Sequence, residues 1–97
     1  MRNEVIWKYP VKVNEITEHK IPGNAIWLSA GADPSGVPCV WARHSKCSPG
    51  QGRAVRFIAL PTGEMPNPKS DETYEFLGRA DCGQFVWHIF EVFDVVF

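Results

Sequence analysis

Short runs of alternating apolar and polar residues follow one another along the chain. Val5, Trp7 and Tyr9 would share one face of a strand, since successive side chains of a strand point to opposite faces. Cys39 and Trp41 repeat this spacing in a later run. The runs are rich in Val, Ile, Phe, Trp and Tyr, which suit a half-buried pleated surface. The runs expected to form strands are Glu4–Val13, Ala25–Ala30, Val37–Arg43, Ala54–Leu60, Tyr74–Arg79 and Gln84–Phe97.

Segments rich in glycine and proline separate these runs and are typical of turns. The pattern predicts an all-β, mainly antiparallel domain: a small sandwich or a partly open barrel of about six strands. Little helix is expected, and Asn14–Lys20 is the one stretch that could form a short helical turn. Pro10 and Pro38 lack a ladder donor, so their strands should lie at sheet edges or be interrupted there.

The last run differs from the others because it is apolar on both faces. Such a strand is either central in its sheet or covered by a second subunit. A domain of this size has little chain to cover both faces, and an exposed apolar terminus favours aggregation. We therefore expect a homodimer, with residues 92–97 packed in the core or at the dimer seam. The expected interface residues are Trp7, Trp87, Phe93, Val95 and Phe97, whereas Trp41 is assigned to the core.

The length of 97 residues corresponds to a single domain spanning residues 1–97. Hydrophobic residues at 44% and charged residues at 22% exclude a disordered tail or a coiled coil. No secretory signal is visible, and the run Phe85–Phe97 is too short to cross a bilayer. A cytoplasmic protein with reduced thiols is expected. The net charge of −1 predicts neither a membrane surface nor nucleic acid as a partner.

Three cysteines and three histidines are candidates for metal or nucleophile chemistry. A zinc site uses four ligands, commonly supplied as two close pairs, and His44 with Cys47 is the only close pair here. Cys39 is expected in the core. Cys82 and His88 would be too far apart on one strand for a nucleophile and its base. No metal, cofactor or catalytic residue is expected, and no enzyme motif is present.

A basic loop from Ala42 to Arg53 is the best candidate for ligand contact. Between Arg43 and Arg56 there are four basic residues and no acid, whereas seven acids follow between Glu64 and Asp94. Long loops in compact domains are often functional. The cations and glycine amides could hold a phosphate or an acidic surface, and a solvated hairpin loop is the alternative. The candidate binding residues are Arg43, His44, Lys46, Gly50, Gly52, Arg53 and Arg56.

Six segments, taken in order, resemble a family of small proteins of unknown function carried by tailed bacteriophages and prophages. They are Ile6–Pro10, Ile21–Ala25, Val37–Ala42, Thr62–Gly63, Tyr74–Gly78 and Val86–Glu91. The chain departs from that pattern in its C-terminal residues 92–97 and in its lengthened basic loop. The resemblance implies a phage context and carries over no catalytic residue.

The resulting hypothesis is a non-enzymatic phage or prophage accessory protein. It would bind a host protein or an anti-phage-defence component through the basic loop. One alternative is a sponge that sequesters a small phosphorylated nucleotide at a dimer interface, using the same cations. A structural component of the virion is a further alternative.

Overall fold

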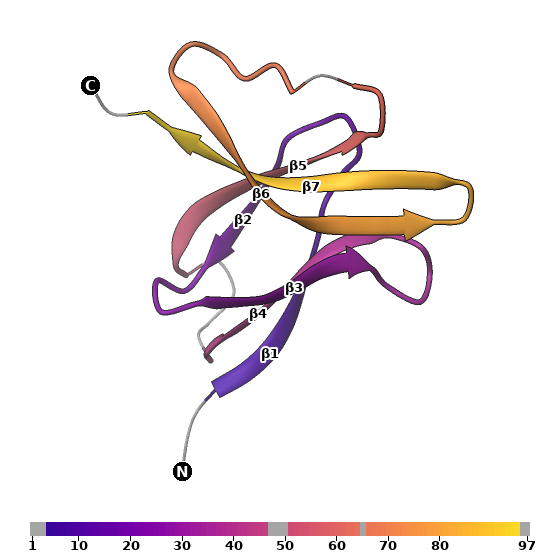
Figure 1. Cartoon of the computed structure of the whole chain (residues 1–97). Coiled ribbons are helices and arrows are strands. Elements are labelled where there is room, and N and C mark those ends of the chain that lie inside the picture. Colours follow the sequence, from indigo (N-terminus) through magenta and orange to yellow (C-terminus); the bar gives the residue numbers. More distant parts are fainter. Residues whose placement is uncertain (1–3, 47–50, 65, 96–97) are drawn as a thin grey trace.

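The computed structural model describes residues 4–46, 51–64 and 66–95. These residues form seven strands and no helix, so the predicted all-β class is confirmed (Figure 1). The strands are β1 (Glu4–Pro10), β2 (Thr17–Ile21), β3 (Ile26–Ala32), β4 (Pro38–Ser45), β5 (Arg53–Pro61), β6 (Glu72–Cys82) and β7 (Phe85–Asp94). Among the described residues, no helix is long and apolar enough to cross a membrane.

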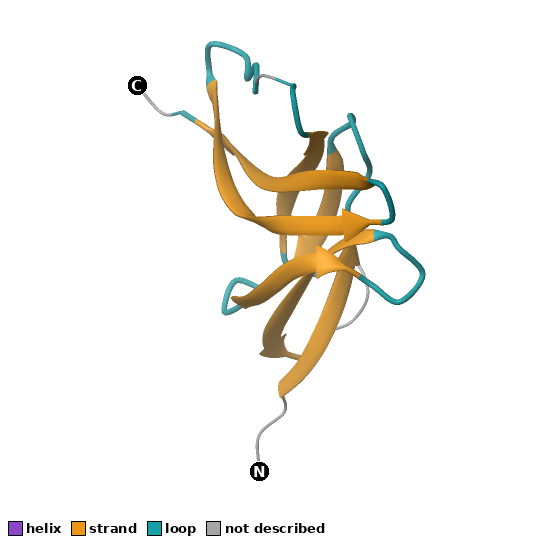
Figure 2. Cartoon of the chain, turned by 45° about the vertical axis from the view of Figure 1, so that its right-hand side comes forward, coloured by secondary structure: helices purple, strands orange, loops and turns teal. Residues whose placement is uncertain are grey.

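The strands form two antiparallel sheets that pack as an open sandwich. One sheet has the order β1-β4-β3, and the other has the order β2-β5-β7-β6. Figures 1 and 2 show the long β6–β7 hairpin crossing over the three-stranded sheet, with the start of β1 at one tip of the molecule. The predicted sandwich is therefore present, and the described strands do not close into a barrel.

The core lies where the inner faces of the two sheets meet. Phe57 of β5 and Ile89 of β7 are fully buried, and so are Ile21 of β2 and Val40 of β4. Trp27 of β3 packs its indole edge-to-face against Phe57, with ring centroids 5.8 Å apart. β1 adds the buried Tyr9 to this core, and β6 adds the fully buried Ala80.

The expectation of a helical turn over Asn14–Lys20 is wrong, because Thr17–Ile21 is strand β2. This strand is five residues long, lies at a sheet edge and pairs with β5. Its sequence is polar except at Ile21, so it carries no apolar alternation to identify it. Short, charged edge strands are common because they discourage pairing between molecules.

Two strand boundaries also differ from expectation. β4 continues to Ser45, so the connection to β5 comprises residues 46–52, and Arg43 and Arg53 lie in strands. Pro10 lies in the edge strand β1, as predicted. Pro38 lies in the central strand β4, where it is the first residue and so interrupts little of the ladder.

The last strand is central in its sheet, which is one of the two arrangements that its two-sided apolar pattern indicated. β7 pairs with β5 on one side and with β6 on the other. Its inner face buries Ile89 completely. On its outer face, Phe90 packs against Phe76 and Tyr74 of β6, with ring centroids 5.7 and 6.0 Å apart. The opposite sheet therefore covers the inner face of β7, and an aromatic cluster covers part of its outer face.

Candidate binding surface

The turn between β2 and β3 anchors both ends of the segment 46–52. Asn24 accepts hydrogen bonds through Oδ1 from the backbone N–H and the hydroxyl of Ser45, at 3.4 and 3.3 Å. On the other side, Gly52 lies directly against the backbone of Ile21 and Pro22. The end of β4 and the start of β5 are therefore held around this turn.

Four cations surround the turn: Lys20 on β2, Arg43 on β4, Lys46 just after β4, and Arg53 at the start of β5. We call this set the basic end. All four residues are exposed. Arg43 lies 3.8 Å from a Glu4 carboxylate oxygen, longer than a hydrogen bond. Within the described ranges, no ion pair involves Lys20 or Lys46. The basic end can therefore offer several hydrated cations to an anionic surface.

Lys20 was not singled out by the sequence pattern, because the strand that carries it was not predicted. Register places Lys20 opposite Ala54, one residue from Arg53. Asn24, which fixes the turn, was likewise treated as an ordinary turn residue. The run of cations between Arg43 and Arg56 gave three of the four residues of this surface, and β2 supplies the fourth.

Arg56 does not belong to the basic end. Its side chain is 25% exposed and donates to Glu72 at 3.0 Å and to Asp94 at 2.6 Å. Asp94 lies on β7, the strand next to β5, and Glu72 lies beside it on β6. The Arg56 guanidinium is therefore paired with two carboxylates of the same chain. These ion pairs account for its position without any ligand.

His44 points into the sandwich and is 5% exposed. The Tyr9 hydroxyl and the His44 Nε2 atom are 2.6 Å apart, and His44 Nδ1 lies 2.9 Å from the Ser45 carbonyl oxygen. Both ring nitrogens therefore have partners within the chain. The structure places this predicted binding residue in the core, behind the cations that flank it in sequence.

Gly52 has a structural reason to be glycine. Its φ is +112°, and a Cβ atom there would lie 2.5 Å from the carbonyl carbon of Ile21. Both features exclude a side chain. Gly50 and Cys47 lie outside the described residues.

The two described cysteines are poor nucleophiles. Cys39 is fully buried, and burial raises its thiol pKa above the ordinary value. Burial is also the largest cause that raises the pKa of Cys82, followed by the charge of Asp81. A raised pKa leaves the thiol protonated at neutral pH, whereas the thiolate is the reactive form. Among the described residues, no group of three or more His, Cys, Asp or Glu side chains is placed to hold a metal ion.

The residues predicted for a dimer interface do not form one row. Trp7 is 57% exposed on edge strand β1. Trp87 and Phe93 are half-buried on central strand β7 of the other sheet, and Val95 follows that strand. Phe97 lies outside the described residues. Trp41 is half-buried rather than in the core.

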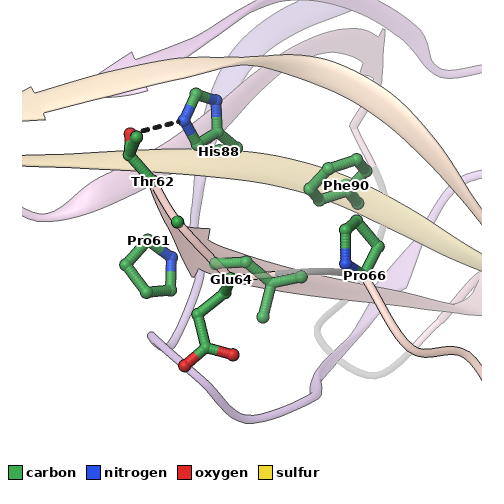
Figure 3. A pocket seen from close by; sticks show the side chains of 8 residues that line it. Pro61, Thr62, Glu64, Pro66, His88 and Phe90 are labelled. Carbon is green, nitrogen blue, oxygen red and sulfur yellow. Dashed lines mark hydrogen bonds between the residues drawn. The ribbon is translucent and has the colours of Figure 1, made fainter.

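A small pocket lies between the end of β5 and the outer face of β7 (Figure 3). Its volume is about 180 Å³, below the range of roughly 300–1,000 Å³ common for small-molecule sites. Thr62 and His88 meet at its edge, with Oγ1 and Nε2 2.9 Å apart. The Pro61–Gly63 turn therefore shapes a pocket with β7, and not with the basic end.

The chain belongs to a family whose only description is domain of unknown function, DUF7352, and the match covers residues 2–95. This family carries no assigned activity to transfer. No curated protein and no solved structure matches the chain.

Proposed function

We propose that the protein is a non-enzymatic binding domain whose basic end docks on an acidic surface of a partner protein. The observation that carries this proposal is that four exposed cations lie on three strands and a loop whose ends meet at one anchored turn. A rigid scaffold that presents charged groups from several elements is the usual basis of a recognition surface. Complementary charge would speed the encounter and restrict the choice of partner.

One histidine and two cysteines that could serve catalysis are held inside the chain or have a raised pKa, which supports a non-enzymatic role. His44 is buried and hydrogen-bonded to the Tyr9 hydroxyl, and the pKa values of the Cys39 and Cys82 thiols are raised. In this proposal the partner is a protein of a bacterial host cell's cytoplasm, such as an anti-phage-defence component. That choice rests on the resemblance of the sequence to phage proteins.

The test is affinity capture from bacterial lysate with the whole chain as bait. The test variant replaces three basic-end cations with neutral residues: Arg43→Gln, Lys46→Gln and Arg53→Gln. The control variant removes the same charge from exposed cations elsewhere: Lys12→Gln, Lys69→Gln and Arg79→Gln. We expect a protein that the wild type and the control capture, and that the test variant does not. Capture should weaken as salt is added, because exposed charges are screened.

Equal capture by the test variant and the wild type would refute the proposal. Captured nucleic acid in place of protein would also refute it. Circular dichroism of each variant shows whether the sandwich is intact.

A further inference from the structure

The free edge of β1 has a backbone and a sequence that suit pairing with a second copy of itself. In the described part of the chain, β1 pairs along one side only, with β4. Its start lies at one tip of the molecule (Figures 1 and 2). Ile6 is 65% exposed, which is high for an apolar residue in a strand. Exposed edge strands of this kind are templates for strand addition.

The hydrogen bonds around β1 show which residues direct their backbone to the free edge. The N–H of Val11 donates to the Pro38 carbonyl at 2.8 Å, so Val11 faces β4. His19 of β2 lies 2.7 Å from the Pro10 carbonyl oxygen, on the side away from β4. Because the pattern alternates along a strand, the odd-numbered residues face β4 and the even-numbered residues face outward. Ile6 therefore directs its N–H and C=O toward the free edge.

We propose that two copies of this chain associate through an antiparallel β1–β1 pairing centred on Ile6. A hydrogen-bonded pair of Ile6 with its symmetry mate fits a two-fold axis, because both residues direct their backbone outward. In this register Glu4 of each copy lies opposite Lys8 of the other copy, so the pairing contains two Glu4–Lys8 pairs. The two three-stranded sheets become one continuous six-stranded sheet.

Charge supports this register. Glu4 and Lys8 lie on the outer face with Arg43 and Asp33, which they contact at 3.8 and 2.9 Å. At each end of the β1–β1 pairing, four charged residues would lie in a row: Arg43 and Glu4 of one copy, then Lys8 and Asp33 of the other. The signs of their charges alternate along this row. Opposite charges directly across a strand pair stabilise it, and like charges destabilise it. Pro10 has no N–H, and His19 covers its carbonyl, so the pairing ends just beyond Lys8.

This inference does not depend on the proposed partner, although Arg43 of the basic end lies beside Glu4 at the seam. Its test uses sedimentation velocity of the whole chain at several concentrations, with the variants Glu4→Lys and Lys8→Glu. We expect the wild type to dimerise and each variant alone to be monomeric, since like charges then face one another. An equal mixture of the two variants should form a heterodimer, because opposite charges again face one another. A monomeric wild type, or homodimers in both variants, would overturn the proposal.

A cross-link keeps the test decisive if these variants fold poorly. Cysteine pairs can bridge Cα atoms roughly 4.4–6.8 Å apart, and a hydrogen-bonded antiparallel pair lies at about 5.5 Å. Ile6→Cys should form a disulfide-linked dimer on mild oxidation. Lys8→Cys is the control, because its symmetry mate would lie four positions away, roughly 13 Å along the strand. Equal cross-linking of both variants, or none in Ile6→Cys, would contradict the register.

Discussion

The indole N–H of Trp27 donates to a carboxylate oxygen of Glu91 at 3.0 Å, joining β3 of one sheet to β7 of the other. Glu91 is 5% exposed. Burial is the largest influence on its carboxyl group and raises the pKa above the ordinary value, while the Trp27 hydrogen bond and the charge of Arg53 oppose that shift. Glu91 is thus a buried acid whose ionisation costs stability.

Glu91→Gln should stabilise the fold at neutral pH. The pKa is higher in the folded state than in the unfolded chain, so folding is favoured fully below the unfolded pKa and loses stability as pH rises through the folded pKa. Glutamine keeps an acceptor for Trp27 and removes the charge. We expect a higher Tm at pH 7, a smaller gain at pH 4, and no gain from Glu64→Gln in an exposed turn. A lower Tm at pH 7 would show that ionised Glu91 stabilises the sandwich.

Tyr9→Phe should destabilise the protein. The change removes the hydroxyl group that lies 2.6 Å from His44 Nε2 and leaves a buried ring nitrogen without that partner. An unsatisfied buried polar group costs about 1–3 kcal/mol. Urea unfolding should show this loss with an unchanged m-value. A variant as stable as the wild type would mean that water replaces the hydroxyl.

Gly78→Ala tests the close approach of the two sheets at β3 and β6. A Cβ atom at Gly78 would lie 2.8 Å from the Cβ of Ala30 and 2.9 Å from its carbonyl oxygen. Overpacking of this kind costs about 1–3 kcal/mol. Gly23→Ala is the control, since nothing lies within 4 Å of its added Cβ and its φ is not positive. Equal stability of the two variants would show that the sheets separate easily there.

Glu72→Gln should reduce the loss of stability in acid. The backbone N–H of Lys69 is the largest cause that lowers the pKa of Glu72, and Arg56 lowers it further. A lowered pKa gives stability that is present above the unfolded pKa and is lost as pH falls through the folded pKa. The wild type should therefore lose stability more steeply than Glu72→Gln below pH 4.5, the ordinary pKa of the group. Parallel acid titrations, followed by circular dichroism, would contradict this role.

Runs of β-favouring residues between turn residues predicted six of the seven strands. β2 could not be predicted in this way, since its inward side chains include His19, which contacts Tyr9 and Phe57 through its ring. Its position is determined by pairing with β5 and not by an apolar pattern of its own.

The candidate site was predicted only in part, because strand pairing also decides which side chains lie together there. Sequence proximity grouped Arg43, His44 and Arg56, but strand alternation turns His44 inward, and Glu72 and Asp94 from later strands pair with Arg56. Lys20 enters the site only through β2. Which charges converge depends on strand register, and that is a property of the whole sheet.

The most direct test of the account maps the contact of the captured partner by hydrogen–deuterium exchange of the chain, free and bound. Binding at the basic end predicts protection in the Pro22–Ala25 turn and at the adjoining ends of β4 and β5, and unchanged exchange in the β6–β7 hairpin. Protection confined to β6 and β7, with the basic end unchanged, would contradict the proposed function.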